Sequence, residues 1–197
     1  MWEARFATDD YVFGTEPAAF LRDHAGYLTP GATALSVADG EGRNAVYLAE
    51  RGLQVTALEY APSAIAKAQK LAAARGVTVD IREVDVLHHD WAETFDLVLG
   101  IFIQFVGPAE RASLFAGLTR STKPGGLVLL HGYTPKQLDY GTGGPRAVEN
   151  LYTEAMLRAA FEGWDILECR SHERVLSEGK GHAGRSALID FIARKPG

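Results

Sequence analysis

Cysteine is nearly absent from this chain, which contains Cys169 and no other among its 197 residues. One cysteine cannot form an internal disulfide, so we expect a reducing environment such as the cytoplasm. No apolar run approaches the ~18 residues that a membrane-spanning helix needs, and the first residues lack the apolar stretch and cleavage site of a signal peptide. We therefore expect a cytoplasmic protein without a membrane partner.

An excess of positive charge is also missing. The chain has 20 Lys and Arg against 25 Asp and Glu, a formal net charge of −5, and no basic run. A protein that wraps a phosphate backbone needs such a run, so we expect small molecules as partners and no nucleic acid. The six histidines show no HExxH or Cys/His spacing, and the neighbours His88 and His89 cannot converge on one ion from a helix. We expect no metal site, and the sequence does not indicate an oligomeric state.

What the sequence does contain is an alternation of strand and helix patterns. Strands are predicted at 34–37, 54–59, 77–84, 95–102 and 127–131, and helices at 44–51, 62–76 and from Pro108 to the turn at Pro124. Asn44 is the expected cap of the first of these helices. After a helix near 153–161, strands at 164–176 and 186–193 follow each other without a helix between them and must pair antiparallel. The pattern predicts an α/β fold, Rossmann-like, with a doubly wound, mainly parallel seven-stranded sheet, a C-terminal antiparallel hairpin and helices on both faces.

The strongest local signal follows the first strand, where Ala38, Gly40 and Gly42 form a tight turn of small residues. The next helix directs free N–H groups to the place where a doubly wound sheet binds nucleotide-like cofactors. Glu59 ends the second strand 17 positions after Gly42, roughly the spacing at which a carboxylate accepts hydrogen bonds from ribose hydroxyls. Asp85, after the third strand, can accept from an adenine amino group. The plainer alternatives are a structural glycine turn, a solvated glutamate and a loop cap.

In this order the motifs resemble those of class I S-adenosylmethionine-dependent methyltransferases. The resemblance covers residues 31–133 and depends on the run Gly40-Glu41-Gly42-Arg43-Asn44, on Glu59 and Asp85, on the strand 95–99 and on the run 123–126. The glycine-containing run is most similar to the small-molecule branch that includes tellurite-resistance and thiopurine methyltransferases. The resemblance implies S-adenosylmethionine as cofactor and in-line methyl transfer to a small-molecule acceptor.

The length of the chain favours a single domain over residues 1–197. The resemblance implies three segments within this domain. Residues 1–30 are an aromatic-rich lead-in, with a short helix expected from Glu16-Pro17, that would close over the donor as a lid with Gly14 as its hinge. Residues 31–133 would form the cofactor-binding core. Residues 134–197 would supply an acceptor-side loop rich in glycine, a helix and the terminal hairpin.

The residues expected to contact the donor follow from the same motifs. The turn backbone would contact the methionine part, Glu59 the ribose, and Asp85 the adenine. The full expected set is Ala38, Gly40, Gly42, Arg43, Asn44, Glu59, Tyr60, Asp85, Val86, Gly100 and Ile101. Two positions depart from the family pattern: Ser36 stands where an acidic residue is usual, and Ala38 replaces the first glycine. Asp39 is the candidate to compensate for Ser36.

Methyl transfer from a sulfonium requires alignment above all, and a base only where the acceptor must lose a proton. The substrate pocket is expected to be lined by Tyr11, Phe13, Phe102, Phe105 and Tyr133. No catalytic residue is certain, and the candidates are His182, His131 and Tyr11. The plainer alternatives are hydrophobic anchoring of the lead-in by Tyr11 and Phe13 and, for His182, a solvent-exposed loop histidine, which we favour.

Two other functions remain open at this stage. An NAD(P)-dependent oxidoreductase is disfavoured because no third glycine follows Gly42 at the GxGxxG spacing and because the chain ends in a hairpin. A non-catalytic S-adenosylmethionine-binding module gains some support from Ser36 and from the absence of an obvious base.

Overall fold

The computed structural model describes residues 2–197, and the chain divides into two compact units. The first contains the chain up to His89 together with 178–181, and the second contains 90–177 and 182–197. Among the described residues, no helix combines the length and the apolar character needed to cross a membrane.

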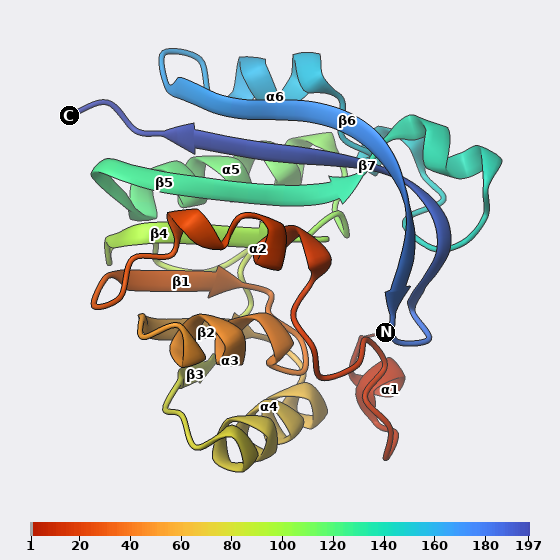
Figure 1. Ribbon diagram of the computed structural model, residues 1–197. Helices are drawn as coiled ribbons and strands as arrows, with labels where there is room; N and C mark the ends of the chain where they lie inside the picture. The colour runs from red at the N-terminus through yellow and green to blue at the C-terminus, as the bar shows by residue number, and fades with distance from the viewer. Residues whose placement is uncertain (1) are drawn as a thin grey trace. The chain divides into compact units, whose positions relative to one another are not determined.

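The first unit is a three-stranded parallel sheet with crossover helices and the N-terminal lead-in. Its strands are β1 (Thr33–Val37), β2 (Gln54–Glu59) and β3 (Asp80–Glu83), in the order β3-β2-β1. They are joined by α3 (Arg43–Glu50) and α4 (Pro62–Arg75), and the lead-in carries α1 (Trp2–Phe6), α2 (Ala19–Asp23) and the 3-10 turn η1 (Ala25–Tyr27) (Figure 1). Because both crossovers run in the same direction along the sheet and are right-handed, α3 and α4 lie on one face.

Local sequence signals explain most boundaries in this unit. Pro62 is the first residue of α4, and the helix ends at Gly76, whose φ of +66° is the left-handed conformation that glycine adopts most easily. The expected cap at Asn44 is wrong: α3 begins at Arg43 after Gly42, whose φ is +92°, and no side chain caps it. The lead-in helix also begins later than Pro17, at Ala19.

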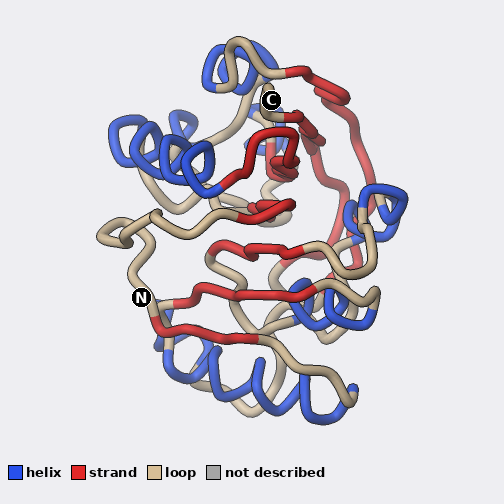
Figure 2. Tube along the Cα trace, turned by 90° about the vertical axis from the view of Figure 1, so that its left-hand side faces the viewer, coloured by secondary structure: helices blue, strands red, loops and turns tan. Residues whose placement is uncertain are grey.

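The second unit contains the other four strands. Parallel β4 (Phe95–Ile101) and β5 (Thr122–Tyr133) are joined by α5 (Pro108–Ser121), and β5 pairs antiparallel with β7 (His182–Arg194). Between β5 and β6 (Asp165–Glu178) the chain forms the 3-10 turns η2 (Pro135–Asp139) and η3 (Val148–Asn150) and the helix α6 (Glu154–Ala160). Figure 2 colours the helices, strands and loops of the chain separately. The strand order in this unit is β4-β5-β7-β6.

The strand order confirms the predicted architecture. The seven strands form one sheet in the order β3-β2-β1-β4-β5-β7-β6, mixed in direction, with the β6–β7 hairpin at the C-terminus. The main differences lie at strand ends: β5 and β7 are longer than predicted, and β3 is shorter. Val77 and Val79 pack against Val46 and Leu71 in an apolar cluster instead of pairing in the sheet, so their alternation did not mark a strand.

Candidate functional site

The carboxyl ends of β1, β2 and β3 meet at one edge of the first unit. The Asp39 N–H donates to the carbonyl of Leu58 (3.0 Å), and the Val84 N–H donates to the carbonyl of Glu59 (2.8 Å). The segments that follow the three strands are therefore tied to their neighbours. In open α/β sheets, ligands bind outside this edge.

Glu59 is the centre of this edge. One of its carboxylate oxygens accepts from the Gly40 N–H (2.8 Å), and the other accepts from the N–H groups of Tyr60 and Ala61 (both 2.9 Å). The side chain is buried. Since a carboxylate offers about four lone-pair sites, three backbone donors leave about one for a ligand hydroxyl.

Asp39 lies beside Glu59 in the turn after β1. Its Oδ1 accepts from the Ser36 hydroxyl (2.5 Å) and from the Ala45 N–H (3.2 Å), while its Oδ2 is buried without a hydrogen-bond partner among the described residues. Burial raises the pKa of the Asp39 carboxyl to about 6, the bond from Ser36 opposes this rise, and the charge of Glu59 adds to it. The sequence indicated Asp39 as the candidate to compensate for Ser36, but it did not predict the direction of the Asp39 side chain.

The two glycines of the turn have different roles. A Cβ at Gly42 would lie 2.7 Å from the Cα and Cβ of Ala68, so glycine is required there for the close approach of α3 to α4. A Cβ at Gly40 would meet only the Phe6 ring, at an ordinary 3.6 Å. Gly40 is thus the glycine whose backbone faces Glu59, and Ala38 adopts a left-handed φ of +50° despite its side chain.

Asp85 and Tyr60 lie at the same edge but outside the buried network. The Asp85 carboxylate accepts from the Leu87 N–H (3.0 Å) and contacts His88 Nδ1 (2.8 Å); these bonds, that from His88 first, lower its pKa. Asp85 therefore caps its own turn, as the plainer interpretation held. Tyr60 is 62% exposed, an unusual position for an aromatic ring, and Val86 is buried.

Arg43 and Asn44, which the resemblance places among the donor contacts, have protein partners. Arg43 forms a buried ion pair with Glu178 (2.9 Å), and Glu178 also accepts from the Ala19 N–H (2.9 Å). Asn44 accepts from the Ala18 N–H (2.9 Å). Both side chains therefore fix the lead-in and the hairpin tip against the start of α3.

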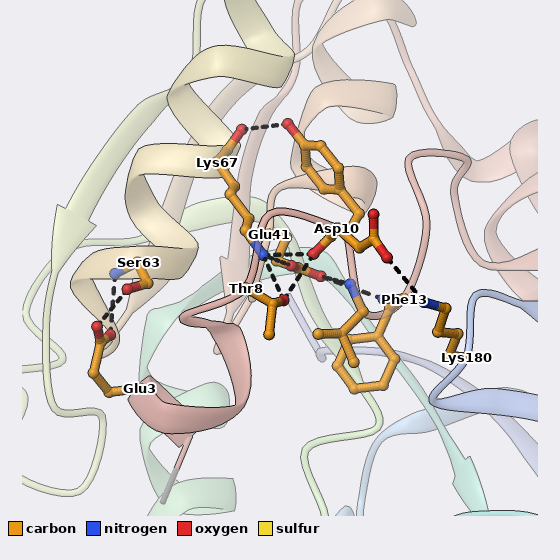
Figure 3. Close-up of polar contacts among 10 residues, drawn as sticks. Glu3, Thr8, Asp10, Phe13, Glu41, Ser63, Lys67 and Lys180 are labelled. Carbon is orange, nitrogen blue, oxygen red and sulfur yellow. Dashed lines mark hydrogen bonds and ion pairs between the residues drawn. The ribbon is translucent and has the colours of Figure 1, made fainter.

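The lead-in is fastened to the glycine turn by Glu41, which the sequence analysis named only as part of the motif. Glu41 accepts from the N–H groups of Val12 (2.8 Å) and Phe13 (3.3 Å) and pairs with Lys67 of α4 (2.8 Å), as Figure 3 shows. The Lys67 ammonium also donates to the Asp10 carbonyl (2.7 Å). Only 1% of the Glu41 side chain and 13% of the Lys67 side chain are exposed. We call this set of contacts the Glu41–Lys67 latch.

Tyr11 and Phe13, expected in the substrate pocket, pack on α4 within the first unit. The Tyr11 hydroxyl donates to the Lys67 carbonyl (3.0 Å), and its side chain joins the cluster around Val46 and Leu71. Phe13 joins Phe6 in a second cluster. These contacts agree with the plainer interpretation, hydrophobic anchoring of the lead-in.

In the second unit, aromatic side chains gather at the ends of β4, β5 and β7. Phe102 follows β4 with a left-handed φ of +56°, a conformation that costs energy for a residue with a side chain. Its ring lies 4.9 Å from His131, 4.8 Å from Tyr133 and 4.0 Å from His182, between ring centroids. The interpretation of His182 as a solvent-exposed loop histidine is wrong: the residue begins β7 and is only 8% exposed.

His131, another candidate base, forms a buried pair with Asp190 directly opposite on β7. Its Nδ1 lies 2.7 Å from Asp190 Oδ1, and His172 Nε2 lies 2.9 Å from Asp190 Oδ2. Burial alone would raise the pKa of Asp190, but the bonds from His131 and His172 outweigh it and hold the pKa below its usual range. An ionised Asp190 only accepts, so it holds the proton of His131 on Nδ1.

A cavity of about 380 Å³ opens in the segment after β5, lined by Gln137, Leu138, Gly141, Gly143, Gly144, Pro145 and Arg146. The buried Gln137 holds its wall by donating to Gly143 O (3.1 Å) and accepting from the Ala187 N–H (2.8 Å). This is the glycine-rich loop expected on the acceptor side. Of the remaining predicted residues, Ile101 and Phe105 are partly buried, and Gly100 has no room for a Cβ beside Ile103 and Leu130.

Comparison with known proteins finds a matching family. Residues 34–126 match a family described as a methyltransferase domain. This part of the chain has the sequence pattern of a methyltransferase domain. The matched residues include the glycine turn, Glu59 and Asp85, so the resemblance noted in the sequence motifs is confirmed, and the oxidoreductase alternative is not supported.

Solved structures share the fold of this methyltransferase domain. A protein from work on converting a disulfide bond into a thioacetal group during echinomycin biosynthesis superposes with a TM-score of 0.78 at 20% identity, over 99% of this chain and 92% of that one. TehB from Haemophilus influenzae gives 0.73 at 18% identity, over 98% and 65%. The N-methyltransferase NodS from Bradyrhizobium japonicum, in complex with S-adenosyl-L-homocysteine, gives 0.73 at 16% identity, over 100% and 97%.

A curated relative is similar over most of this chain. Hemagglutinin 1 from Eikenella corrodens is 25% identical over 169 residues, which is 83% of this chain and 54% of that protein. The chain therefore spans about half the length of the curated relative that it matches.

Proposed function

We propose that this protein transfers the methyl group of S-adenosylmethionine to a small-molecule acceptor by in-line displacement. The observation that carries the proposal is the pair of neighbouring carboxylates, Glu59 and Asp39, at the carboxyl edge of the first unit. Glu59 is hydrogen-bonded to the Gly40 N–H (2.8 Å), and Asp39 lies beside it in the turn. Together with the methyltransferase match over residues 34–126, this arrangement suits a ligand that has hydroxyl groups and a cation.

The residues at this edge fit an adenosyl sulfonium. Glu59 has about one acceptor site left for a ribose hydroxyl, and Asp39 Oδ2 is buried without a hydrogen-bond partner among the described residues. Tyr60, Asp85 and Val86 are the candidates to bind the adenine. The exposed Tyr60 ring offers a flat apolar surface, and the Asp85 carboxylate faces solvent.

The chain's own residues then have to position the reactants and exclude water. A bound sulfonium supplies an activated methyl group with a good leaving group. The work left for the protein is alignment, which is worth several orders of magnitude in rate. In the second unit, Phe102, Tyr133 and the nearby cavity are the proposed acceptor side, and His131 is the group that could take a proton from a protic acceptor.

Small molecules in the cytoplasm are the proposed acceptors. The formal charge of −5 without a basic run disfavours a polyanion. The cavity of about 380 Å³ falls within the common size range of small-molecule sites.

Calorimetric titration tests the proposal directly. S-adenosylmethionine and S-adenosylhomocysteine should bind and NADH should not, and turnover should appear with a panel of thiols, metalloid oxyanions, amines and phenols. Binding of NADH alone would refute the proposal. Donor binding without turnover on any acceptor class would favour a non-catalytic module.

Variants of two neighbouring glutamates sharpen the test. Glu59→Ala should weaken donor binding by about 1.5–3 kcal/mol, because a charged hydrogen-bond acceptor is lost. Glu83→Gln is the matched control, since Glu83 pairs with Glu59 in the sheet register but is exposed. Equal donor affinity in Glu59→Ala and wild type would remove Glu59 from the site.

A further inference from the structure

Asp39 is the one acidic side chain of the glycine turn whose hydrogen bonding is incomplete. Ser36 and the Ala45 N–H both donate to Oδ1, at 2.5 and 3.2 Å. Oδ2 is inaccessible to solvent and has no hydrogen-bond partner among the described residues. A buried carboxylate oxygen without a donor is costly, so such an atom needs an explanation.

The surroundings of Asp39 make the missing partner a cation. Glu59 raises the pKa of Asp39 through its negative charge, in addition to the larger effect of burial. The charge of Arg43 lowers the pKa of Asp39, but the Arg43 guanidinium donates to Glu178 at 2.9 Å and so is already paired. The turn therefore holds two neighbouring carboxylates, and its basic residue is occupied elsewhere.

The chemistry of the proposed methyl donor indicates which of its cationic groups could be the missing partner of Asp39. S-adenosylmethionine has two cationic groups, a sulfonium and an α-ammonium. A sulfonium has no hydrogen to donate, whereas an ammonium has three. Only the ammonium can both neutralise Asp39 and complete the hydrogen bonding of Oδ2.

We infer that Asp39, oriented by the Ser36 hydroxyl, receives the α-ammonium group of the donor. The inference depends on the proposed function, since it assigns one group of the same ligand. It makes Asp39 a specificity-determining residue and Ser36 a positioning residue that acts through it.

Two ligands that differ only in the α-ammonium group distinguish loss of the Asp39–ammonium contact from structural disruption of the glycine turn. The probes are S-adenosylhomocysteine and its deaminated analogue, in which hydrogen replaces the α-ammonium. Wild-type protein should bind S-adenosylhomocysteine at least tenfold more tightly than the analogue. Asp39→Asn should lose at least tenfold in affinity for S-adenosylhomocysteine and less than threefold for the analogue. Asn keeps an oxygen for Ser36 and Ala45, so the turn should retain its shape.

Two further variants complete the design. Ser36→Ala should lower the affinity for S-adenosylhomocysteine by a smaller factor than Asp39→Asn, again without changing that for the analogue. Asp80→Asn, an exposed aspartate on β3, is the control and should change neither.

The outcomes separate this inference from the proposed function. Tight binding of S-adenosylhomocysteine without preference over the analogue would overturn the role of Asp39 and leave the proposed function standing. Equal losses for both ligands in Asp39→Asn would also overturn it, because the side chain would then act on the turn alone. If wild type bound neither ligand, the proposed function and the inference would fall together.

Discussion

Replacing Lys67 with methionine should loosen the lead-in more than it loosens the rest of the first unit. The Lys67 ammonium is the only side-chain cation within 4 Å of the Glu41 carboxylate among the described residues, at 2.8 Å, and 1% of the Glu41 side chain is exposed. Removing one partner of a buried pair typically costs about 3–5 kcal/mol. Glu41 keeps two backbone N–H donors, and Lys67 is partly exposed, so we expect about 2–3 kcal/mol in the free energy of unfolding.

The second half of this prediction concerns the double variant. Once Lys67 is gone, the buried charge of Glu41 is the source of the cost, so adding Glu41→Gln should restore about half of the lost stability. Urea unfolding gives the free energies, and hydrogen exchange at the Val12 and Phe13 amides reports the lead-in. Lys70→Met, on the exposed side of α4, is the control. A loss below about 0.5 kcal/mol for Lys67→Met, or additive effects in the double variant, would refute the latch.

Three further predictions test the turn and the acceptor side. Because the pKa of Asp39 is raised from 3.8 to about 6, its ionisation lowers the free energy of unfolding as the pH rises through this window. In thermal or urea unfolding, Asp39→Asn should be as stable as wild type near pH 4 and more stable by roughly 1–3 kcal/mol near pH 7.5. Parallel pH profiles of the two proteins would contradict this. Gly42→Ala should lower the melting temperature far more than Gly40→Ala, since only the former places a Cβ 2.7 Å from Ala68; similar losses would show that backbone φ alone matters. His131→Asn should slow methylation of phenols at least tenfold and leave methylation of thiols of low pKa nearly unchanged, and equal effects on both acceptors would exclude His131 as a base.

The parts of the fold that could be predicted are those with local signals. The helix from Pro62 to the stop at Gly76 and the strand ending at Glu59 agree with the structure residue by residue or nearly so. Proline, glycine and apolar periodicity act over a few residues, so the sequence carries them directly. The division of residues 1–197 into one lead-in, one core and one acceptor-side segment stays a prediction.

The parts that could not be predicted depend on contacts between distant positions. Glu41 meets Val12 across 29 positions, and Arg43 meets Glu178 across 135. Nothing local distinguishes a glutamate that fastens a lead-in from one on a solvated turn. His182 was misassigned for the same reason: the left-handed turn at Phe102, far away in the chain, brings a ring against it.

Side-chain direction in the glycine turn explains why the motif alone could not locate the charged anchor. In a strand, alternate residues face alternate sides, so position 36 has a predictable direction. After the strand, Ala38 and Gly40 adopt φ of +50° and +67°, and the alternation no longer holds. The backbone changes direction there, and the Asp39 carboxylate points back to Ser36, whose hydroxyl donates a hydrogen bond to it. Glu41 is paired in the latch and both oxygens of Glu59 accept from N–H groups, so of the acidic side chains at this turn Asp39 is the one with an oxygen that has no donor.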